Sequence, residues 1–137
     1  MLGFDLTLAC PESFEPDCDI LDAARKEGAV VLVVHDPYEA ARGSIAVNTD
    51  VWASMGQEAE AEKRKRAFAA YMVDDALMAA ADPSAVFMHC LPAHRGEEVT
   101  EEVLEGKRSI VWEQALNRLY IQEAILDFLL QQGKETS

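Results

Sequence analysis

The chain has 137 residues, of which 50% are hydrophobic and 27% are charged, and this composition predicts a single globular domain with a substantial core. The formal net charge of −13 argues against nucleic acid and anionic membrane surfaces as partners, because phosphate groups are bound by basic surfaces. No stretch of the sequence approaches the roughly 20 apolar residues that a membrane-spanning helix needs.

The first half of the chain alternates between apolar runs and helix-forming segments. We expect strands over residues 4–10, 29–34 and 44–52, with helices over 19–27 and 37–42 between them. The second of these strands, AVVLVV, is continuously apolar and rich in β-branched residues. Such a run is typical of a strand that is covered on both faces of a parallel sheet.

The second half of the chain continues the alternation. In order, we expect helices over 57–66 and 73–81, a strand over 84–90, a short helix from Thr100 to Gly106, a strand over 108–112 and a helix over 114–131. Strands that alternate with helices predict the α/β class, here a doubly wound, mainly parallel, Rossmann-like sheet of about five strands. Since nothing looks like a linker or an internal repeat, we expect residues 1–137 to form one domain.

Two loops follow predicted strands and are the candidate ligand sites. In open parallel sheets, ligands bind beyond the carboxyl ends of the strands. The segment NTDVWASMG (48–56) and the segment FMHCLPAHRG (87–96) both reach such ends. A phosphate-binding glycine loop is not present, because the seven glycines are scattered and do not form a Gly-x-Gly-x-x-Gly set.

The first loop combines an acidic residue with a predicted helix start. Ser54 and Gln57 have the spacing of a capping box. The backbone N–H groups around Met55 would then suit an anion such as a carboxylate, and Asp50 would suit an ammonium group. The alternative is that these residues only cap and pack the helix.

The second loop holds His89, Cys90 and His94, and several roles are open for them. Cys90 is either a small buried side chain or a substrate contact, and His94 is either a solvated loop residue or a ligand. A zinc site lacks an identifiable fourth ligand, and a cysteine–histidine nucleophile lacks an orienting partner in the sequence. We therefore expect no bound metal and no cofactor.

The cysteines and the last helix bear on location and assembly. The three cysteines are irregularly spaced, which argues against a disulfide framework and predicts the cytoplasm or an organelle matrix. Eleven of the sixteen residues from Ala115 to Leu130 are apolar, and the polar ones are spread around the helix. This helix should therefore need cover on more than one side, which predicts association with another chain.

Three stretches together carry a family resemblance. The segments TDVWASMGQE, HCLPAHRGEEVTEEV and WEQALNRLYIQEAIL resemble, in the same order, the ornithine-binding domain of the ornithine carbamoyltransferases. That family belongs with the aspartate carbamoyltransferases and makes citrulline and phosphate from ornithine and carbamoyl phosphate. The resemblance implies an enzyme of the transferase class, with L-ornithine as a ligand and a homo-oligomer, a trimer in the intact family, as the assembly.

The resemblance also implies roles for residues of both loops. Asp50, Ser54 and Met55 match the residues that hold the α-amino and α-carboxyl ends of ornithine. In the second loop, Cys90 would lie near the side-chain amine and the carbamoyl group, and the Leu91 carbonyl would accept a hydrogen bond from the carbamoyl nitrogen.

Arg118 matches an arginine of the family that reaches the reacting carbamoyl phosphate. The resemblance thus implies Asp50, Cys90 and Arg118 as catalytic residues.

The chain also departs from the family pattern. The family binds carbamoyl phosphate with a Ser-x-Arg-Thr loop and a His-Pro-x-Gln segment, and neither occurs in this sequence. The family's first strand and helix of the ornithine domain, with an Asp-Gly-Asn-Asn turn, are also not matched. We therefore expect carbamoyl phosphate to bind only with a further domain and the chain to be inactive alone. The alternative is a standalone amino-acid-binding or protein-interaction module.

Overall fold

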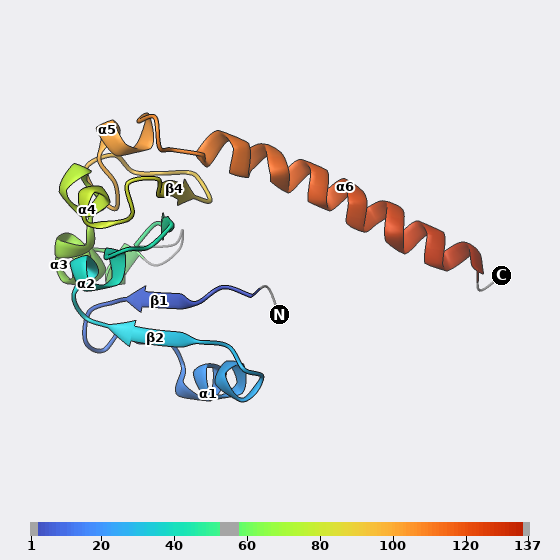
Figure 1. Cartoon of the computed structure of the whole chain (residues 1–137), viewed down its shortest axis with the longest axis horizontal. Helices are drawn as coiled ribbons and strands as arrows, with labels where there is room; N and C mark the ends of the chain where they lie inside the picture. The colour runs from blue at the N-terminus through green and yellow to red at the C-terminus, as the bar shows by residue number, and fades with distance from the viewer. Residues whose placement is uncertain (1–2, 53–57, 136–137) are drawn as a thin grey trace.

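The computed structural model describes residues 3–52 and 58–135 (Figure 1). Its elements in chain order are β1 (Leu6–Ala9), α1 (Cys18–Lys26), β2 (Val31–Val34), α2 (Pro37–Ala41), β3 (Ala46–Thr49), α3 (Glu58–Phe68), the 3-10 helix η1 (Ala69–Tyr71), α4 (Asp75–Ala80), β4 (Val86–His89), α5 (Glu101–Leu104) and α6 (Val111–Glu135). The predicted alternation of strands and helices is confirmed, and every expected helix is present.

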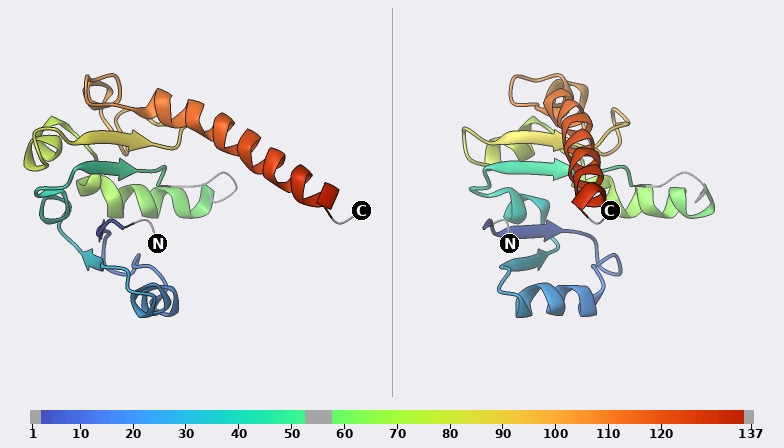
Figure 2. Two further views of the ribbon diagram at one scale, coloured as in Figure 1. Left: turned by 45° about the vertical axis from the view of Figure 1, so that its right-hand side comes forward. Right: turned by 90° about the vertical axis from the view of Figure 1, so that its right-hand side faces the viewer.

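The strands form two parallel pairs. β1 pairs with β2, and β3 pairs with β4, with Thr49 of β3 opposite His89 of β4. Figure 2 shows the four strands in the order β4, β3, β1, β2, with their arrowheads pointing the same way in the right-hand view. The α/β fold with parallel strands is confirmed, but the described residues form two separate two-stranded sheets, where we expected one sheet of about five strands.

The predicted fifth strand over 108–112 is wrong in extent. Ser109 forms a single isolated bridge with Phe87, because only two backbone hydrogen bonds join the segments, from the Phe87 N–H to Arg108 and from the Ile110 N–H to Phe87. The chain then turns into α6, whose first turn is closed by the Gln114 N–H donating to the Ile110 carbonyl. Helix formation therefore takes the last two residues of the apolar run.

Side chains at helix starts explain several of the boundaries. Asp36 and Asp74 cap α2 and α4 by accepting hydrogen bonds from the N–H groups of Tyr38 (2.9 Å) and Leu77 (2.8 Å). The Thr100 hydroxyl accepts from the Val103 N–H in the same way at the start of α5. These caps fix where α2, α4 and α5 begin.

The hydrophobic core lies around β4. Phe87 is completely buried, and Met78, Val99 and Val111 pack with it from α4, the segment before α5, and the first residue of α6. The β1–β2 pair is much less covered, since Leu32 keeps 56% of its surface exposed. The packed part of the molecule is therefore centred on the β3–β4 pair.

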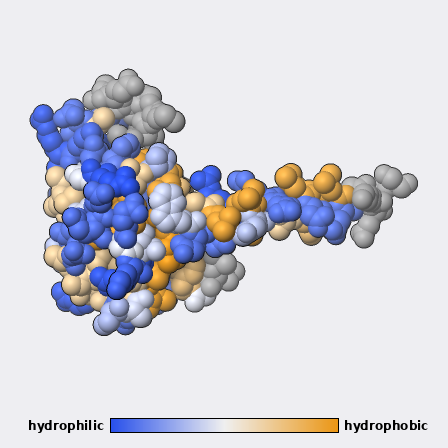
Figure 3. All heavy atoms as spheres, turned by 90° about the horizontal axis from the view of Figure 1, so that it is seen from above, coloured by the Kyte–Doolittle hydropathy of each residue, from blue (hydrophilic) through white to orange (hydrophobic). Residues whose placement is uncertain are grey.

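Helix α6 leaves the body after its first turns and extends away from it (Figures 1 and 3). Its large apolar side chains are exposed by 49–68%, namely Trp112, Leu116, Leu119, Tyr120, Ile121, Ile125, Leu126, Phe128, Leu129 and Leu130. The apolar side chains that we expected to need cover are exposed, and the predicted association with another chain stays a prediction. Within the described ranges, no helix is both long enough and apolar enough to cross a membrane.

Candidate functional site

The carboxyl ends of β3 and β4 bring the two predicted loops together. Because Thr49 and His89 are paired in register, the next residues, Asp50 and Cys90, leave the sheet side by side. The Cys90 thiol donates a hydrogen bond to Asp50 Oδ1 over 3.1 Å. The expectation that an acidic turn and a thiol turn share one rim of the sheet is met.

This contact determines the chemistry of the thiol. The hydrogen bond to the Asp50 carboxylate raises the pKa of Cys90, and burial and the negative charge of Asp50 act in the same direction. The positive charge of Arg118 lowers this pKa, but by less. Cys90 is therefore a neutral hydrogen-bond donor near pH 7, which makes a thiolate nucleophile the weaker of the alternatives left by the sequence.

Arg118 approaches the same rim from α6. Its Nη1 donates to the Cys90 carbonyl at 3.5 Å, a long hydrogen bond that nevertheless places the guanidinium beside Cys90. An open depression of about 520 Å³ runs along this part of α6, lined by Gln114, Asn117, Arg118, Tyr120 and Ile121. Three predicted catalytic residues, Asp50, Cys90 and Arg118, thus meet in one place.

Leu91 adopts an unusual backbone conformation, with φ of 58° and a cis peptide bond to Pro92. Its N–H donates to His89 Nδ1 over 2.8 Å, so this ring nitrogen acts as an acceptor. The backbone N–H of His89 donates in turn to the Gln114 side chain at 3.0 Å. The turn that carries Cys90 and Leu91 is therefore held by His89 from one side and by α6 from the other.

The buried carboxylate of Glu98 contacts residues on both sides of this turn. Glu98 has no exposed surface, and its Oε1 lies 3.3 Å from His89 Nε2 and accepts the backbone N–H of His94 at 2.6 Å. The contact with His89 is poorly aligned, and Glu98 Oε2 has no hydrogen-bond partner among the described residues. We did not predict Glu98 or Gln114 from the sequence, where Glu98 looks like one of several loop acids.

The three residues that we weighed as zinc ligands, His89, Cys90 and His94, do not form one set. His89 and Cys90 group with Asp50, with ligand atoms within 4.8 Å of one another, whereas His94 groups with Glu97 and Glu98. The Nδ1 atom of the His89 ring accepts the Leu91 N–H, and Nε2 lies 3.3 Å from Glu98 Oε1. Among the residues that the structure describes, the combination of His89, Cys90 and His94 is therefore not supported.

Two predicted binding residues, Ser54 and Met55, lie outside the described residues, as does the expected capping contact of Gln57. The flanking segments are described. Trp52 stacks on Phe68 with ring centroids 6.2 Å apart, which connects the end of β3 with the end of α3. This stacking packs Trp52, two residues after Asp50, against the last residue of α3.

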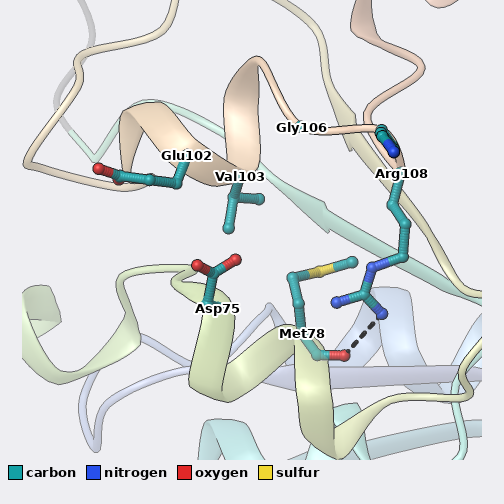
Figure 4. Close-up of a pocket in the computed structure, with 7 residues that line it drawn as sticks. Asp75, Met78, Glu102, Val103, Gly106 and Arg108 are labelled. Atoms are coloured by element: carbon teal, nitrogen blue, oxygen red, sulfur yellow. Dashed lines mark hydrogen bonds between the residues drawn. The ribbon is translucent and has the colours of Figure 1, made fainter.

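A second pocket lies away from the rim (Figure 4). It has a volume of about 140 Å³ and is lined by Asp75, Met78, Glu102, Val103, Gly106, Lys107 and Arg108. Arg108 is engaged with the Met78 carbonyl at 2.9 Å, and two acidic and two basic residues offset each other in charge. Nothing in this arrangement selects a ligand, and the pocket shares no residue with the rim.

Comparison with known proteins gives one consistent result. The family model described as "Aspartate/ornithine carbamoyltransferase, Asp/Orn binding domain" matches residues 1–129. The ornithine carbamoyltransferase of Oleidesulfovibrio alaskensis is 57% identical over 128 residues, which is 93% of this chain and 43% of the relative. That of Geobacter metallireducens is 54% identical over 131 residues, again 43% of the relative.

Solved structures show the same likeness. The ornithine carbamoyltransferase of Pyrococcus furiosus superimposes with a TM-score of 0.82 at 47% identity, over 91% of this chain and 41% of that one. The anabolic enzyme of Campylobacter jejuni gives a TM-score of 0.86 at 38% identity, over 95% of this chain and 44% of that one. The chain thus spans less than half the length of these relatives.

Proposed function

Because the chain belongs to the aspartate/ornithine carbamoyltransferase family, we propose that residues 1–137 form the ornithine-binding domain of a carbamoyltransferase. The complete enzyme would transfer the carbamoyl group of carbamoyl phosphate to the side-chain amine of L-ornithine, giving L-citrulline and phosphate. The observation that supports this best is the 3.1 Å contact between Asp50 and Cys90 at the carboxyl ends of two parallel strands. This is where ligands bind in such sheets.

Each end of ornithine has a proposed partner. Asp50 would bind the α-ammonium group of ornithine through its carboxylate, and Ser54 and Met55 would bind the α-carboxylate. Cys90 would contact the side-chain amine. A carboxylate beside a neutral donor suits a molecule that carries two amino groups and one carboxylate.

The reaction requires a neutral amine as nucleophile. An alkyl ammonium group like that of lysine has a pKa of about 10.4, so only about one molecule in a thousand is neutral near pH 7.4. A carboxylate near the amine positions it but also favours its charged form. Because the pKa of Cys90 is raised, its thiol can orient the amine without adding a second negative charge.

Charge develops on oxygen when the amine attacks the carbamoyl carbon. Arg118, which approaches Cys90 from α6, would stabilise this oxyanion, while the Leu91 carbonyl would accept a hydrogen bond from the carbamoyl nitrogen. His89 and Glu98 would keep the Leu91 turn in position. Closure of a second domain over the rim would exclude water from the reacting groups.

We also propose that carbamoyl phosphate requires a further domain and that the complete enzyme is a homo-oligomer. The sequence contains no arginine followed by threonine and no histidine followed by proline, so the family's carbamoyl phosphate motifs are not supplied by these residues. A cytoplasmic location, or the mitochondrial matrix in a eukaryote, stays a prediction from the cysteine pattern.

Titration with L-ornithine, followed by NMR, tests the proposal. We expect weak binding, with a Kd of roughly 1 mM, that perturbs the residues next to Asp50 and Cys90. Asp50→Asn should weaken binding at least tenfold, whereas the matched Asp127→Asn on the exposed part of α6 should leave it unchanged. Ornithine binding that does not depend on Asp50, or no binding at all, would contradict the assigned site.

An activity assay separates the proposal from its alternative. The chain alone should form no citrulline from ornithine and carbamoyl phosphate. Micromolar ornithine binding without catalysis would instead favour a standalone amino-acid-binding module, and citrulline formation would show that no further domain is needed.

A further inference from the structure

The loop between β4 and α5 gathers three side chains that can bind a metal ion. One ligand atom from each of His94, Glu97 and Glu98 lies within 4.8 Å of the other two. This set contains no cysteine and does not include His89, so it differs from the set that we weighed from the sequence. Acidic clusters are common on protein surfaces, and the evidence for a site here comes from its buried member.

Glu98 is a buried carboxylate with one unpartnered oxygen. The residue has no exposed surface, and its Oε1 accepts the backbone N–H of His94 at 2.6 Å. Its Oε2 is also buried, and no described residue forms a hydrogen bond with it. A buried carboxylate oxygen without a partner is destabilising, because the water that solvates it in the unfolded chain is not replaced. Such an atom calls for a further group that carries positive charge or donates a hydrogen bond.

The unpartnered oxygen of Glu98 faces the ring of His94. Nδ1 of His94 lies 3.8 Å from Glu98 Oε2, which is too long for a hydrogen bond. Two ligands of a tetrahedral zinc ion, each about 2.1 Å from the metal, are roughly 3.4 Å apart. The two atoms therefore have nearly the separation that a shared metal ion requires, and small side-chain rotations close the difference.

The other side of this cluster is open to solvent. The His94 side chain is 54% exposed and that of Glu97 is 33% exposed. Lys65 Nζ lies 2.7 Å from Glu97 Oε1, and the second oxygen of this carboxylate remains to bind a metal. An ion can thus enter beside His94 and Glu97 and reach the buried oxygen of Glu98.

The backbone of this loop holds the three ligands close together. Gly96 has a φ of 81°, a conformation that favours glycine, and its N–H donates to the Val99 carbonyl at 2.9 Å. The N–H of Glu97 donates to the His94 carbonyl at 3.0 Å. A tight turn therefore places residues 97 and 98 next to residue 94, so less entropy is lost when the ligands bind one ion.

We propose that His94, Glu97 and Glu98 bind one divalent transition-metal ion through one imidazole nitrogen and two carboxylate oxygens. This combination suits Zn²⁺, and three protein ligands leave room for water in the remaining position. The ion neutralises Glu98, whose other oxygen lies 3.3 Å from His89 Nε2, and so reinforces the support of the neighbouring turn. The inference does not depend on the proposed function.

Calorimetric titration of the reduced 137-residue chain with Zn²⁺ tests the site. We expect one ion per chain with a Kd of about 10 μM or lower. His94→Ala and Glu98→Gln should each weaken binding at least tenfold, and glutamine retains an acceptor for the His94 N–H. Glu102→Gln on the exposed side of α5 is the matched control and should leave the affinity unchanged. Binding that neither substitution weakens, or no binding, would overturn the proposal.

Spectroscopy distinguishes this site from the rim, where Asp50, His89 and Cys90 form a second group of possible ligands. Co²⁺ bound by a thiolate gives a strong near-ultraviolet charge-transfer band, and we expect no such band for the ion bound here. In NMR spectra of the histidine rings, Zn²⁺ should shift the ring nitrogens of His94 and leave those of His35 unchanged. A thiolate band that disappears in Cys90→Ser, with unshifted His94 signals, would place the ion at the rim and refute the assignment.

Discussion

Two regions of this chain are equally apolar but have opposite environments. Around β4, Phe87 is completely buried by residues from α4, α5 and the start of α6. Along the outer part of α6, Phe128 is 60% exposed, together with most of its apolar neighbours. Hydrophobic residues stabilise a fold only where other parts of the same chain cover them, so the outer part of α6 contributes surface for a partner and little to the stability of the chain.

Replacing a phenylalanine by alanine in each of the two regions should give the largest difference in the free energy of unfolding. Phe87→Ala removes a fully buried ring and should lower the free energy of unfolding by about 3–5 kcal/mol. Phe128→Ala should change it by less than about 0.5 kcal/mol, because the ring is already in water. Urea denaturation of both variants measures this, and a similar loss in both would show that α6 is covered in solution.

Substitution of the buried carboxylate of Glu98 should give the next largest loss in the free energy of unfolding. Glu98→Ala leaves the backbone N–H of His94 without its acceptor, which should cost about 1–3 kcal/mol. Glu102→Ala on the exposed side of α5 serves as the control and should stay within about 0.5 kcal/mol. Equal stability of the two variants would mean that water reaches Glu98.

At the rim, where the body and α6 meet, substitutions of Asp50 and of Arg118 should change the reactivity of the Cys90 thiol in opposite directions. Asp50→Asn removes the main cause of the raised pKa of Cys90, so more thiolate forms at pH 8 and alkylation by iodoacetamide should become several-fold faster. Arg118→Gln should slow alkylation by a smaller factor, because its charge lowers this pKa. Cys18, which is exposed on α1, provides the internal control.

The smallest effect should come from the ion pair between α3 and the loop before α5. Lys65 Nζ lies 2.7 Å from Glu97 Oε1, but both side chains are partly exposed. Lys65→Met should therefore lower the free energy of unfolding by less than about 1 kcal/mol, and the difference should vanish in 1 M salt. A larger or salt-independent loss would indicate that Lys65 contributes by packing.

Much of the fold could be predicted because its signals are local. The continuous apolar run of β2 and the polar residues at helix starts, such as Asp74 and Thr100, depend only on neighbours within a few residues. The placement of Asp50 and Cys90 at strand ends, and the apolar character of α6 around its circumference, follow from the same local patterns. Each of these predictions agrees with the structure.

The tertiary structure decided what depends on contacts between distant segments. It turned the last two residues of the expected strand over 108–112 into the start of α6, buried Glu98 next to His89, and brought Arg118 to the Cys90 carbonyl. It also left β1 and β3 unpaired with each other. Periodicity describes which faces of a segment are apolar, but the partner that covers a face, or pairs an edge, is chosen by packing across the whole molecule.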